Sequence, residues 1–459
     1  MLNKVLLINS NLCTDPYPVF PLGLAYIAAA LKKESFEVQI LDMIFENAEL
    51  EEVINNFQPD FIGLSIRNID DAKFNRTKYF IPDCHQIVTR IRAASTSKVI
   101  VGGSGFSLFP EQILDLTGAD YGIVGEAEKS IVKLLKLLSK TTGSLNEKLE
   151  NIEGLVFREK NSIKKNSTVI SGHRDIVSPL FTENLLKNYL LNSSMAGIQT
   201  QRGCPFNCNY CSYPLIEGHN VRYRDPEEVA EDISLAVRSG ARYFFIVDSV
   251  FNISNDHVAE VCNQIIRRNL KIEWGCFLRP SGITEEIIKL MVMAGLKHIE
   301  FGSDSFCDEV LSDYGKKFTY EDILLSSEIA AGMDVNYAHF LIMGGPGETE
   351  STMLTSFKNS LCLKKTVIFP FIGMRLFPKT ALYERAIREN IISKEHSLLE
   401  PFFYISPDIK AGQIETLLLD FQNRSPRWIF EDRTPQQQAI INRLRAKGIK
   451  GPLWEFLTS

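Results

Sequence analysis

Residues 200–211 read Thr-Gln-Arg-Gly-Cys-Pro-Phe-Asn-Cys-Asn-Tyr-Cys and place Cys204, Cys208 and Cys211 in a C-x3-C-x2-C pattern. Glycine, proline and asparagine favour turns, so the segment is expected to form a loop. A loop with this spacing can wrap three thiolates around one corner of a cubane iron–sulfur cluster. Four irons take four ligands, so three cysteines leave one iron open. An open iron serves an enzyme, whereas a purely structural site avoids it.

Two other interpretations of the three cysteines stay open. A structural zinc site usually takes four Cys or His ligands as two spaced pairs, and no second pair stands near this loop. His219 lies eight residues after Cys211 and could be a fourth ligand, although its spacing is irregular. The three cysteines could also be buried and inert. The specific spacing, with the aromatic Tyr210 before the last cysteine, favours the cluster.

This cysteine loop resembles that of the radical S-adenosylmethionine (SAM) superfamily. In that family the amino and carboxylate groups of SAM chelate the open iron, and one electron from the cluster cleaves SAM to a 5′-deoxyadenosyl radical. The resemblance implies a [4Fe-4S] cluster on Cys204, Cys208 and Cys211, SAM as a second cofactor, and an electron donor such as flavodoxin or ferredoxin as a partner.

Length and composition exclude several classes of protein. The 459 residues can bury a large core in two to four domains, and 45% hydrophobic with 23% charged residues is ordinary for a soluble globular chain. A net charge of −6 argues against nucleic acid as a partner. No run of apolar residues is long enough to span a membrane. The nine cysteines, an odd and scattered number, fit a reducing cytoplasm, and residues 1–9 predict a first strand rather than a signal peptide.

Short apolar runs alternate with helical segments over residues 1–137, which we interpret as the first domain. The expected strands are 4–9, 38–42, 61–66, 98–103 and 121–124, with a helix from 21 to about 33. This alternation predicts an α/β fold with a doubly wound, Rossmann-type parallel sheet. Ligands of such sheets bind at the carboxyl ends of the strands.

Distinctive residues follow the third, fourth and fifth expected strands. Glycine at such places allows the backbone to approach a ligand closely, although a Gly-Gly pair can also simply turn the chain. The fourth strand is not followed by the dinucleotide pattern G-x-G-x-x-G, because Leu108 occupies the last position. The candidate cofactor-binding residues are Ser65, Arg67, Asn68, Gly102, Gly103, Ser104, Gly105, Gly125 and Glu126.

These segments together resemble the cobalamin-binding domain that precedes many radical SAM cores. The matching parts are Pro21-Leu22-Gly23-Leu24, Gly63-Leu64-Ser65, Gly102-Gly103 and residues 119–126. One departure concerns the histidine of the Asp-x-His-x-x-Gly motif, which binds cobalt in many corrinoid proteins. No histidine occurs before His85. Either cobalamin binds without a protein imidazole, or the domain has lost cobalamin and serves as a scaffold.

Arg67 has two possible roles in the loop after the third strand. A guanidinium has no lone pair to offer cobalt, so it could cover the lower face of a corrinoid and keep the metal without a lower ligand. Alternatively, Arg67 could pair with Asp70 or Asp71 and order the loop.

Residues 138–195 look irregular and are interpreted as a linker that contains a small hairpin, with arms near 154–158 and 163–165. Strand–helix alternation then resumes over residues 196–385. The expected strands are 198–200, 243–248, 272–276, 297–302, 337–343 and 371–376, and Asp225 with Pro226 should start a helix. Six such units predict a partial (β/α)6 barrel, whose chemistry should lie at the carboxyl ends of its strands.

Polar and glycine residues at those strand ends are the candidates for holding SAM. Carboxylates there could bind ribose hydroxyls or an amino group, glycines allow close backbone approach, and backbone edges could read adenine. Ordinary capping of strand ends is the alternative. The candidates are Asp248, Glu300, Gly302, Asp304, Gly344, Gly345, Met374 and Arg375. In order after the cysteine loop, and with Tyr314-Gly315-Lys316, they resemble the radical SAM core.

The remaining features concern the substrate side. Residues 386–459 are expected to form a small helical cap with helices near 414–421 and 436–447. In this cap, Trp428, Trp454 and Phe402-Phe403-Tyr404 could cover the barrel mouth or belong to the core. Cys276 and Cys307 lie on or near strand ends and are the candidate catalytic residues, as hydrogen donors that quench a radical; alternatively they are buried and inert.

The resemblance implies a cobalamin-type radical SAM enzyme that modifies a small-molecule or natural-product substrate by C-methylation. A second hypothesis keeps cobalamin but expects rearrangement, epimerisation or dehydrogenation. A third, from another class, is a non-catalytic corrinoid- or SAM-binding sensor. Methylthiolation of RNA is disfavoured, because the chain has no basic C-terminal module.

Overall fold

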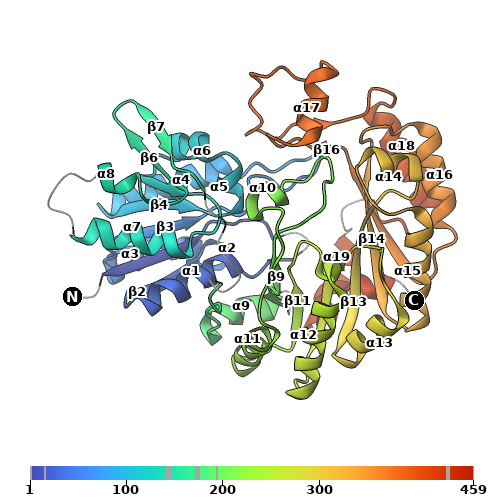
Figure 1. Cartoon of the computed structure of the whole chain (residues 1–459), viewed down its shortest axis with the longest axis horizontal. Helices are drawn as coiled ribbons and strands as arrows, with labels where there is room; N and C mark the ends of the chain where they lie inside the picture. The colour runs from blue at the N-terminus through green and yellow to red at the C-terminus, as the bar shows by residue number, and fades with distance from the viewer. Residues whose placement is uncertain are drawn as a thin grey trace. The chain divides into compact units, whose positions relative to one another are not determined.

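The computed structural model describes residues 3–14, 17–140, 146–168, 170, 176–192, 195–430 and 435–457. The chain divides into two compact units (Figure 1). Unit 1 comprises Met1–Ala72, Thr77–Asn188 and Leu215–Gly218. Unit 2 comprises Lys73–Arg76, Tyr189–Pro214 and His219–Ser459. Among the described residues, no helix has the length and apolar character needed to cross a membrane.

Unit 1 is built on a seven-stranded sheet with the order β2-β1-β3-β4-β5-β6-β7. Its first five strands are mutually parallel, which confirms the predicted doubly wound sheet. Apolar residues of these strands and of the helices that cover them form a continuous core. The strands are β1 (Lys4–Asn9), β2 (Glu37–Asp42), β3 (Phe61–Ser65), β4 (Lys98–Gly102) and β5 (Tyr121–Ile123), and the helices include α1 (Leu22–Lys33), α3 (Leu50–Phe57), α4 (Ile81–Ala94), α5 (Ser104–Leu108), α6 (Pro110–Thr117) and α7 (Glu128–Lys140).

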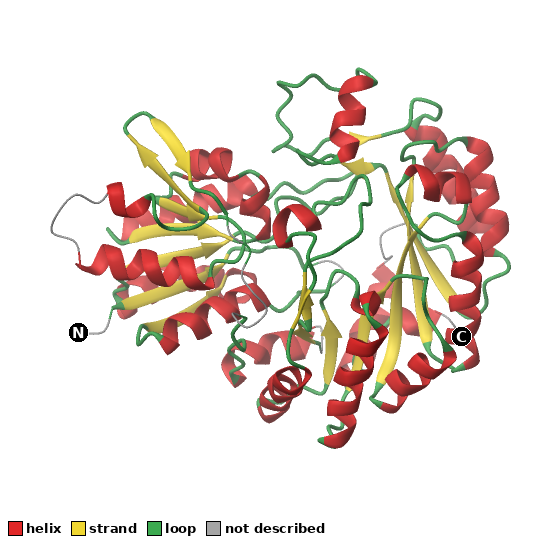
Figure 2. Ribbon diagram, viewed as in Figure 1, coloured by secondary structure: helices red, strands yellow, loops and turns green. Residues whose placement is uncertain are grey.

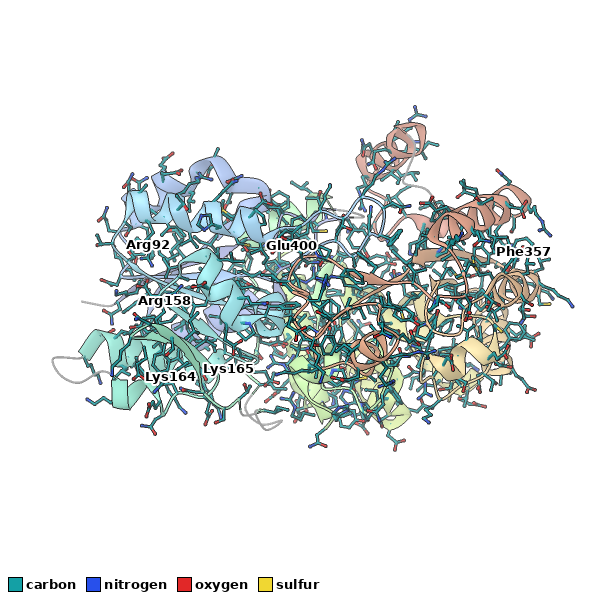
Figure 3. All side chains as sticks on the ribbon, turned by 90° about the horizontal axis from the view of Figure 1, so that it is seen from above. Arg92, Arg158, Lys164, Lys165, Phe357 and Glu400 are labelled. Atoms are coloured by element: carbon teal, nitrogen blue, oxygen red, sulfur yellow. The ribbon has the colours of Figure 1, made fainter. Side chains whose placement is uncertain are left out.

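The hairpin predicted after residue 138 is present as β6 (Leu155–Glu159) and β7 (Ser162–Lys165). It adds to the sheet of unit 1, because β6 pairs antiparallel with β5. Ion pairs lie on the surface of the hairpin. They include Lys164 with Glu159 at 2.6 Å and Arg158 with Asp115 at 2.8 Å (Figure 3). Exposed pairs of this kind contribute little to stability, so the hairpin is held mainly by its backbone ladder.

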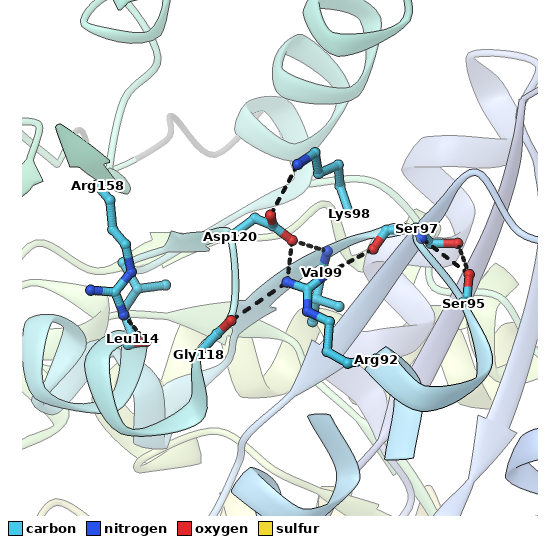
Figure 4. A network of polar contacts seen from close by, with 9 residues as sticks. All are labelled: Arg92, Ser95, Ser97, Lys98, Val99, Leu114, Gly118, Asp120 and Arg158. Carbon is cyan, nitrogen blue, oxygen red and sulfur yellow. Dashed lines mark hydrogen bonds and ion pairs between the residues drawn. The ribbon is translucent and has the colours of Figure 1, made fainter. Parts of the chain in front are cut away.

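A polar network ties α4 to the amino ends of β4 and β5 (Figure 4). The carboxylate of Asp120 accepts hydrogen bonds from the Val99 amide at 2.8 Å and from Arg92 at 2.5 Å, and pairs with Lys98 at 3.2 Å. Burial acts to raise the pKa of Asp120, but these hydrogen bonds outweigh it and the pKa lies below its usual value. Since ligands of a parallel sheet bind at the opposite, carboxyl ends, this network is structural.

Unit 2 contains a six-stranded parallel sheet with the order β15-β14-β13-β12-β11-β8, which confirms the predicted partial barrel of six strand–helix units. Figure 2 shows the connecting helices on one face of this sheet. The strands are β8 (Ala196–Ile198), β11 (Tyr243–Ile246), β12 (Glu273–Leu278), β13 (Leu296–Asp304), β14 (Asn336–Met343) and β15 (Thr366–Ile372), and the helices are α11 (Pro226–Arg238), α12 (Asn255–Arg267), α13 (Glu285–Met293), α14 (Asp308–Asp313), α15 (Tyr320–Gly332) and α16 (Glu350–Ser360). As predicted, Asp225 caps α11 by accepting from the Glu227 amide at 2.8 Å.

The sixth strand of unit 2 lies earlier than the predicted 371–376. It runs over Thr366–Ile372 and includes Pro370, which is tolerated because β15 is an edge strand. Gly373 ends it with a positive φ of 70°. The next residues, β16 (Met374–Arg375), pair antiparallel with β17 (Phe403–Tyr404) instead.

The C-terminal region forms α18 (Ala411–Arg424) and α19 (Pro435–Ala446), which confirms the two predicted helices. Trp428 belongs to the core of unit 2. Its ring packs on Phe421 and on Phe357, which Figure 3 labels, and its indole donates to Ser360 Oγ at 3.0 Å. Trp428 therefore does not cover the barrel mouth.

Candidate functional site

The cysteine loop follows β8 and is anchored at its start by Asp248. This buried carboxylate accepts from the Thr200 amide at 2.7 Å, from the Thr200 hydroxyl at 2.6 Å and from the Gln201 amide at 3.3 Å. His257 contacts the same hydroxyl through Nε2 at 3.1 Å. Both oxygens of Asp248 thus position the loop, and its expected role in binding SAM remains a prediction.

The three cysteine thiols lie close enough to influence one another. Burial raises the pKa of Cys211 to about 12, and the charges of Cys208 and Cys204 add to this effect. Burial also raises the pKa of Cys208, with a further contribution from Cys204. The three thiols therefore share one region, and the thiols of Cys208 and Cys211 resist ionisation by themselves. Iron ions would supply the positive charge that converts them to thiolate ligands, so this donor set fits a cluster.

Among the described residues, no group of three or more His, Cys, Asp and Glu side chains converges on a single metal-ion position. A zinc site directs all of its ligands at one ion, whereas each thiolate of a cubane binds a different iron.

Asp304 anchors the other end of the cysteine loop. It ends β13 with a positive φ of 64°, and its carboxylate is bonded to the phenol of Tyr210 and to the ammonium of Lys316. Lys316 also donates to the Tyr210 oxygen at 3.2 Å. Burial acts to lower the pKa of Lys316, but Asp304 and Cys208 outweigh it and raise the pKa. Asp304, which was expected to bind SAM, therefore holds the loop.

Two further residues beside the loop, Arg279 and Gly315, were not among the candidate site residues, although Gly315 belongs to the Tyr314-Gly315-Lys316 stretch noted in the sequence. The Arg279 guanidinium, one residue after β12, stacks on the Phe206 ring at 4.1 Å, and burial lowers its pKa while Cys208 and Cys204 oppose this. Gly315 lies so close to the loop that a Cβ atom there would be 2.8 Å from the Asn207 carbonyl oxygen. Their only signal in the sequence was their position, after a strand and within the Tyr-Gly-Lys stretch.

The turn after β14 is closed around Glu348. The buried Glu348 carboxylate accepts from the Tyr314 hydroxyl at 3.0 Å and from the Gly344 amide at 3.3 Å, and burial raises its pKa to about 7. A Cβ atom on Gly345 would lie 2.5 Å from the Tyr314 oxygen. At Gly344 and Gly345 the absence of a side chain thus lets other parts of the same chain approach closely.

Met374 and Arg375 are buried. The Arg375 guanidinium donates to the Leu376 carbonyl at 2.7 Å and to the Leu398 carbonyl at 2.8 Å. These bonds tie β16 to the segment after α17 (Ala381–Arg388). A role of this pair in reading adenine remains a prediction.

Glu300 and Gly302 lie inside β13 rather than after it, because the strand continues to Asp304. A register shift between Phe301 and Asp304 lengthens the strand at this point. Glu300 accepts a hydrogen bond from the Trp454 indole at 3.4 Å. Both also lie within the predicted strand 297–302, and their expected role in holding SAM remains a prediction.

The two candidate catalytic cysteines differ in position. Cys276 is fully buried on the helix-facing side of β12, where burial and the charge of Cys262 of α12 raise its pKa. This burial favours the alternative that Cys276 is inert, and its role as a hydrogen donor remains a prediction. Cys307 lies in the turn before α14, and burial raises its pKa. A role for Cys307 remains a prediction.

In unit 1 the candidate cofactor-binding residues meet at one edge of the sheet. Ser65 pairs with Gly102 and Gly102 with Ile123, so the loops after β3, β4 and β5 are neighbours. Ser104 Oγ donates to the Arg67 carbonyl at 3.1 Å, and the Gly125 amide donates to Ser107 Oγ at 2.9 Å. The structure thus brings the loops that carry the nine candidates, including Asn68, Gly103, Gly105 and Glu126, to one edge.

Two of these glycines allow the loops to pack on each other. A Cβ atom on Gly103, whose φ is +104°, would lie 2.6 Å from the Ile66 carbonyl oxygen. One on Gly105 would lie 2.9 Å from the Arg67 carbonyl oxygen. The glycines therefore shape the edge, and a corrinoid would meet the surface that they create.

The Arg67 side chain is exposed and donates to Asn68 Oδ1 at 3.4 Å. Asp70 instead accepts from the Ala72 amide at 2.9 Å, and Asp71 from the Lys78 amide at 3.0 Å. Within the described part of unit 1, Arg67 forms no ion pair with either aspartate. Its guanidinium is available at the sheet edge, as covering a corrinoid would require.

Two family models match this chain. The B12 binding domain matches residues 11–135, and the Radical SAM superfamily matches residues 198–358. An uncharacterized methyltransferase of Pyrococcus horikoshii is 25% identical over 92% of each chain. The tryptophan 2-C-methyltransferase of Streptomyces laurentii is 23% identical over 83% of this chain and 74% of that protein.

A solved structure shares the whole fold. The radical S-adenosylmethionine methyltransferase TsrM from Kitasatospora setae, with cobalamin and a [4Fe-4S] cluster bound, superposes with a TM-score of 0.85 at 22% identity, over 100% of this chain and 98% of that one. The order of the two matched domains agrees with the two sheets described above. The chain therefore belongs to the radical SAM enzymes that carry a B12 binding domain ahead of the radical SAM domain.

Proposed function

We propose that this protein is a cobalamin-dependent radical SAM methyltransferase that acts on an unactivated carbon of a small molecule. One observation carries the proposal: Cys204, Cys208 and Cys211 stand together on the loop after β8 of unit 2, in a chain whose first unit matches a B12 binding domain. Both curated relatives reported above are named as methyltransferases, which supports this reaction.

Each part of the site has a role in this proposal. Cys204, Cys208 and Cys211 hold the cluster, while Asp248 and Asp304 fix the loop that carries them. The cluster and SAM supply one-electron radical chemistry when bound, and cobalamin supplies a transferable methyl group.

Two positively charged side chains beside the thiols also favour a cluster at this site. Lys316 contacts Cys208, and Arg279 lies within the electrostatic reach of Cys208 and Cys204. Both cations would offset the negative charge of thiolates in a buried site.

The corrinoid would lie over the loops after β3, β4 and β5. There Arg67 would help to hold the corrinoid and could not coordinate its metal, since a guanidinium has no free lone pair. The cluster also requires an electron donor of the flavodoxin or ferredoxin class and a reducing, cytoplasmic setting. Nucleic acid is not the substrate in this proposal.

The test begins with anaerobic purification and assay of iron, sulfide and cobalt. SAM and a chemical reductant are then added with a cell extract as the source of substrate. Formation of S-adenosylhomocysteine together with 5′-deoxyadenosine supports radical methylation. 5′-Deoxyadenosine alone would favour rearrangement, epimerisation or dehydrogenation, and neither product from a loaded protein would favour a sensor.

A matched pair of cysteine variants controls this test. Cys208→Ala removes a cluster ligand and should abolish both iron binding and SAM cleavage. Cys362→Ala changes an exposed cysteine far along the chain and should leave both unchanged. Equal iron content in the two variants would contradict the cluster assignment. An untargeted metabolite comparison of a deletion strain then searches for the substrate.

A further inference from the structure

One face of the unit 2 sheet is packed against helices, and aromatic rings gather on the other. Leu341 of β14 and Ile368 of β15 belong to the core beneath α16 and α18. Because side chains alternate along a strand, Phe340, Phe369 and Phe371 lie on the opposite face, which we name the inner face. The ring of Phe340 stacks with those of Phe369 at 5.3 Å and Phe371 at 6.2 Å.

A second group of rings lies across the same face. Trp274 of β12 donates its indole N–H to the Ala294 carbonyl after α13, on the helix side. Phe277, three residues on, therefore lies on the inner face, where it meets Phe245 of β11 edge-on at 4.9 Å. Phe277 is 38% exposed and Phe371 is 42% exposed, although both lie within strands. Exposed rings in such positions are available to a ligand.

Between the two groups, β13 leaves a gap at Gly302. The neighbouring Phe301 stacks on His339, which faces α15 and contacts Ser327, so Gly302 lies on the inner face. A Cβ atom at Gly302 would meet no heavy atom within 4 Å. The inner face thus has open space beside Gly302, which we name the slot; Phe340 lies on the β14 side, and Phe277, in register with Glu300, lies on the β12 side.

The deep end of this slot is polar. Glu300 lies two residues before Gly302 and directly beside Phe277 in the register of the two strands. Trp454 forms the floor, where it packs on Ala338 and Val367 and donates its indole N–H to Glu300. The Glu300 carboxylate also lies 3.8 Å from His298 Nε2. A carboxylate accepts several hydrogen bonds, so an N–H of a ligand can join these contacts.

The slot is close to the cysteine loop. Gly302 lies two residues before Asp304, which binds Tyr210 of the loop. Phe277 lies two residues before Arg279, which stacks on Phe206 of the loop. Two strand residues span about 7 Å. A ring in the slot would therefore lie about one layer of side chains below the residues that hold the loop.

We propose that the slot over Gly302 binds the aromatic ring of the substrate, and that Glu300 accepts a hydrogen bond from an amine or ring N–H of the same molecule. This inference rests on the proposed function and adds the substrate class. SAM also carries a planar ring, its adenine, and Gly302 was expected from the sequence to bind a cofactor. The amino and carboxylate groups of SAM stay at the level of the cluster, however, whereas the slot and Glu300 lie deeper.

The test measures binding to the anaerobically purified, cluster-loaded full chain. Three probes are titrated by ligand-observed NMR: tryptamine, 2-cyclohexylethylamine as its non-aromatic counterpart, and S-adenosylhomocysteine for the adenosyl group. Gly302→Val fills the slot, and Gly412→Val adds the same bulk in α18, where a Cβ atom also meets nothing within 4 Å. Far-UV circular dichroism and iron content establish that each variant is folded and loaded.

The wild type should bind tryptamine more tightly than 2-cyclohexylethylamine. Gly302→Val and Phe277→Ala should each weaken tryptamine binding about tenfold, because the first fills the space for the ring and the second removes apolar contact with it. Gly412→Val should leave tryptamine binding unchanged. Glu300→Gln should also weaken tryptamine, and S-adenosylhomocysteine should bind all variants alike. If Gly302→Val weakens the binding of S-adenosylhomocysteine as much as that of tryptamine, the slot is the adenosyl site. If the two amines bind equally, or if tryptamine does not bind, the substrate is not of the aromatic class.

These outcomes are separate from those of the proposed function, because binding needs no turnover. SAM products without aromatic binding would overturn this inference alone. Aromatic binding to a loaded protein that never converts SAM would overturn the proposed function alone.

Discussion

The phenol of Tyr210, one residue before Cys211, is hydrogen-bonded to the carboxylate of Asp304, 94 residues further along the chain at the end of β13. The ammonium of Lys316 joins both groups, and it is only 9% exposed. The position of the cysteine loop thus depends on a charged pair that the loop itself does not contain.

Asp304→Asn should therefore destabilise unit 2 and reduce iron retention. The change leaves the buried Lys316 ammonium without its counter-charge, which costs about 3–5 kcal/mol. Lys316→Met in the same chain should recover part of that loss, because the uncompensated charge is gone. Thermal unfolding and iron content of the two single variants and the double variant measure this coupling. A double variant as unstable as the sum of the singles would contradict it.

The elements of both sheets could be predicted because each strand is a short apolar run bounded by turn residues. The contacts of the site could not. Asp304 and Glu300 both follow the rule for polar residues near a strand end, yet the first anchors a loop and the second lies inside the strand. The register shift that lengthens β13 depends on pairing with β14, which no local pattern records.

The glycines at strand ends show the same limit of prediction from sequence. Patterns of glycine at strand ends predicted close approach correctly, but they do not say what approaches. At Gly103 and Gly345 it is the chain itself, the Ile66 carbonyl and the Tyr314 hydroxyl. At Gly302 the space is open. Only three-dimensional contacts distinguish a glycine that shapes a loop from one that leaves room for a ligand.

Gly103→Ala should loosen the edge of the unit 1 sheet. Its φ of +104° disfavours any side chain, and the new methyl would lie 2.6 Å from the Ile66 carbonyl oxygen, so a loss of about 2 kcal/mol or more is expected. Gly23→Ala is the matched control, because it lies in α1 with nothing within 4 Å and should stabilise by up to about 1 kcal/mol. Hydrogen–deuterium exchange of the β3 and β4 amides should rise in the first variant only. Unchanged protection there would refute the packing role.

Glu348 should make the stability of unit 2 depend on pH. Its pKa is raised to about 7 by burial, while Tyr314, Thr352 and the Gly344 amide oppose this and Cys307 lies nearby. The folded state holds the proton more tightly than the unfolded chain, so the contribution is full below pH 4.5 and is lost as the pH rises through 7. The loss is on the order of 3 kcal/mol.

Glu348→Gln cannot ionise and should remove this decline. Urea unfolding at pH 5, 6, 7 and 8, followed by tryptophan fluorescence, compares the variant with the wild type. The difference in unfolding free energy between the two proteins should change steadily in favour of the variant as the pH rises. A difference that is constant over this range would show that Glu348 has its ordinary pKa.

The fully buried pair of Arg224 and Asp232 also supports the start of the cysteine loop. Their charged groups are 2.6 Å apart, and Arg224 also donates to the Gln199 carbonyl at 3.0 Å, one residue before Thr200. Asp232→Leu leaves a guanidinium buried without its partner and should cost about 3–5 kcal/mol. Arg224→Met with Asp232→Leu replaces both charges by apolar groups and should be more stable than Asp232→Leu alone.

Iron content then separates stability from loop position in these variants. The double variant lacks the bond from Arg224 to Gln199, so it should fold and yet retain less iron than the wild type. Asp420→Leu with Arg424→Met removes an exposed ion pair of α18 and should alter neither quantity by much. If the double variant binds iron as fully as this control, Arg224 stabilises α11 without positioning the cysteines, and Asp248 alone fixes the start of the loop.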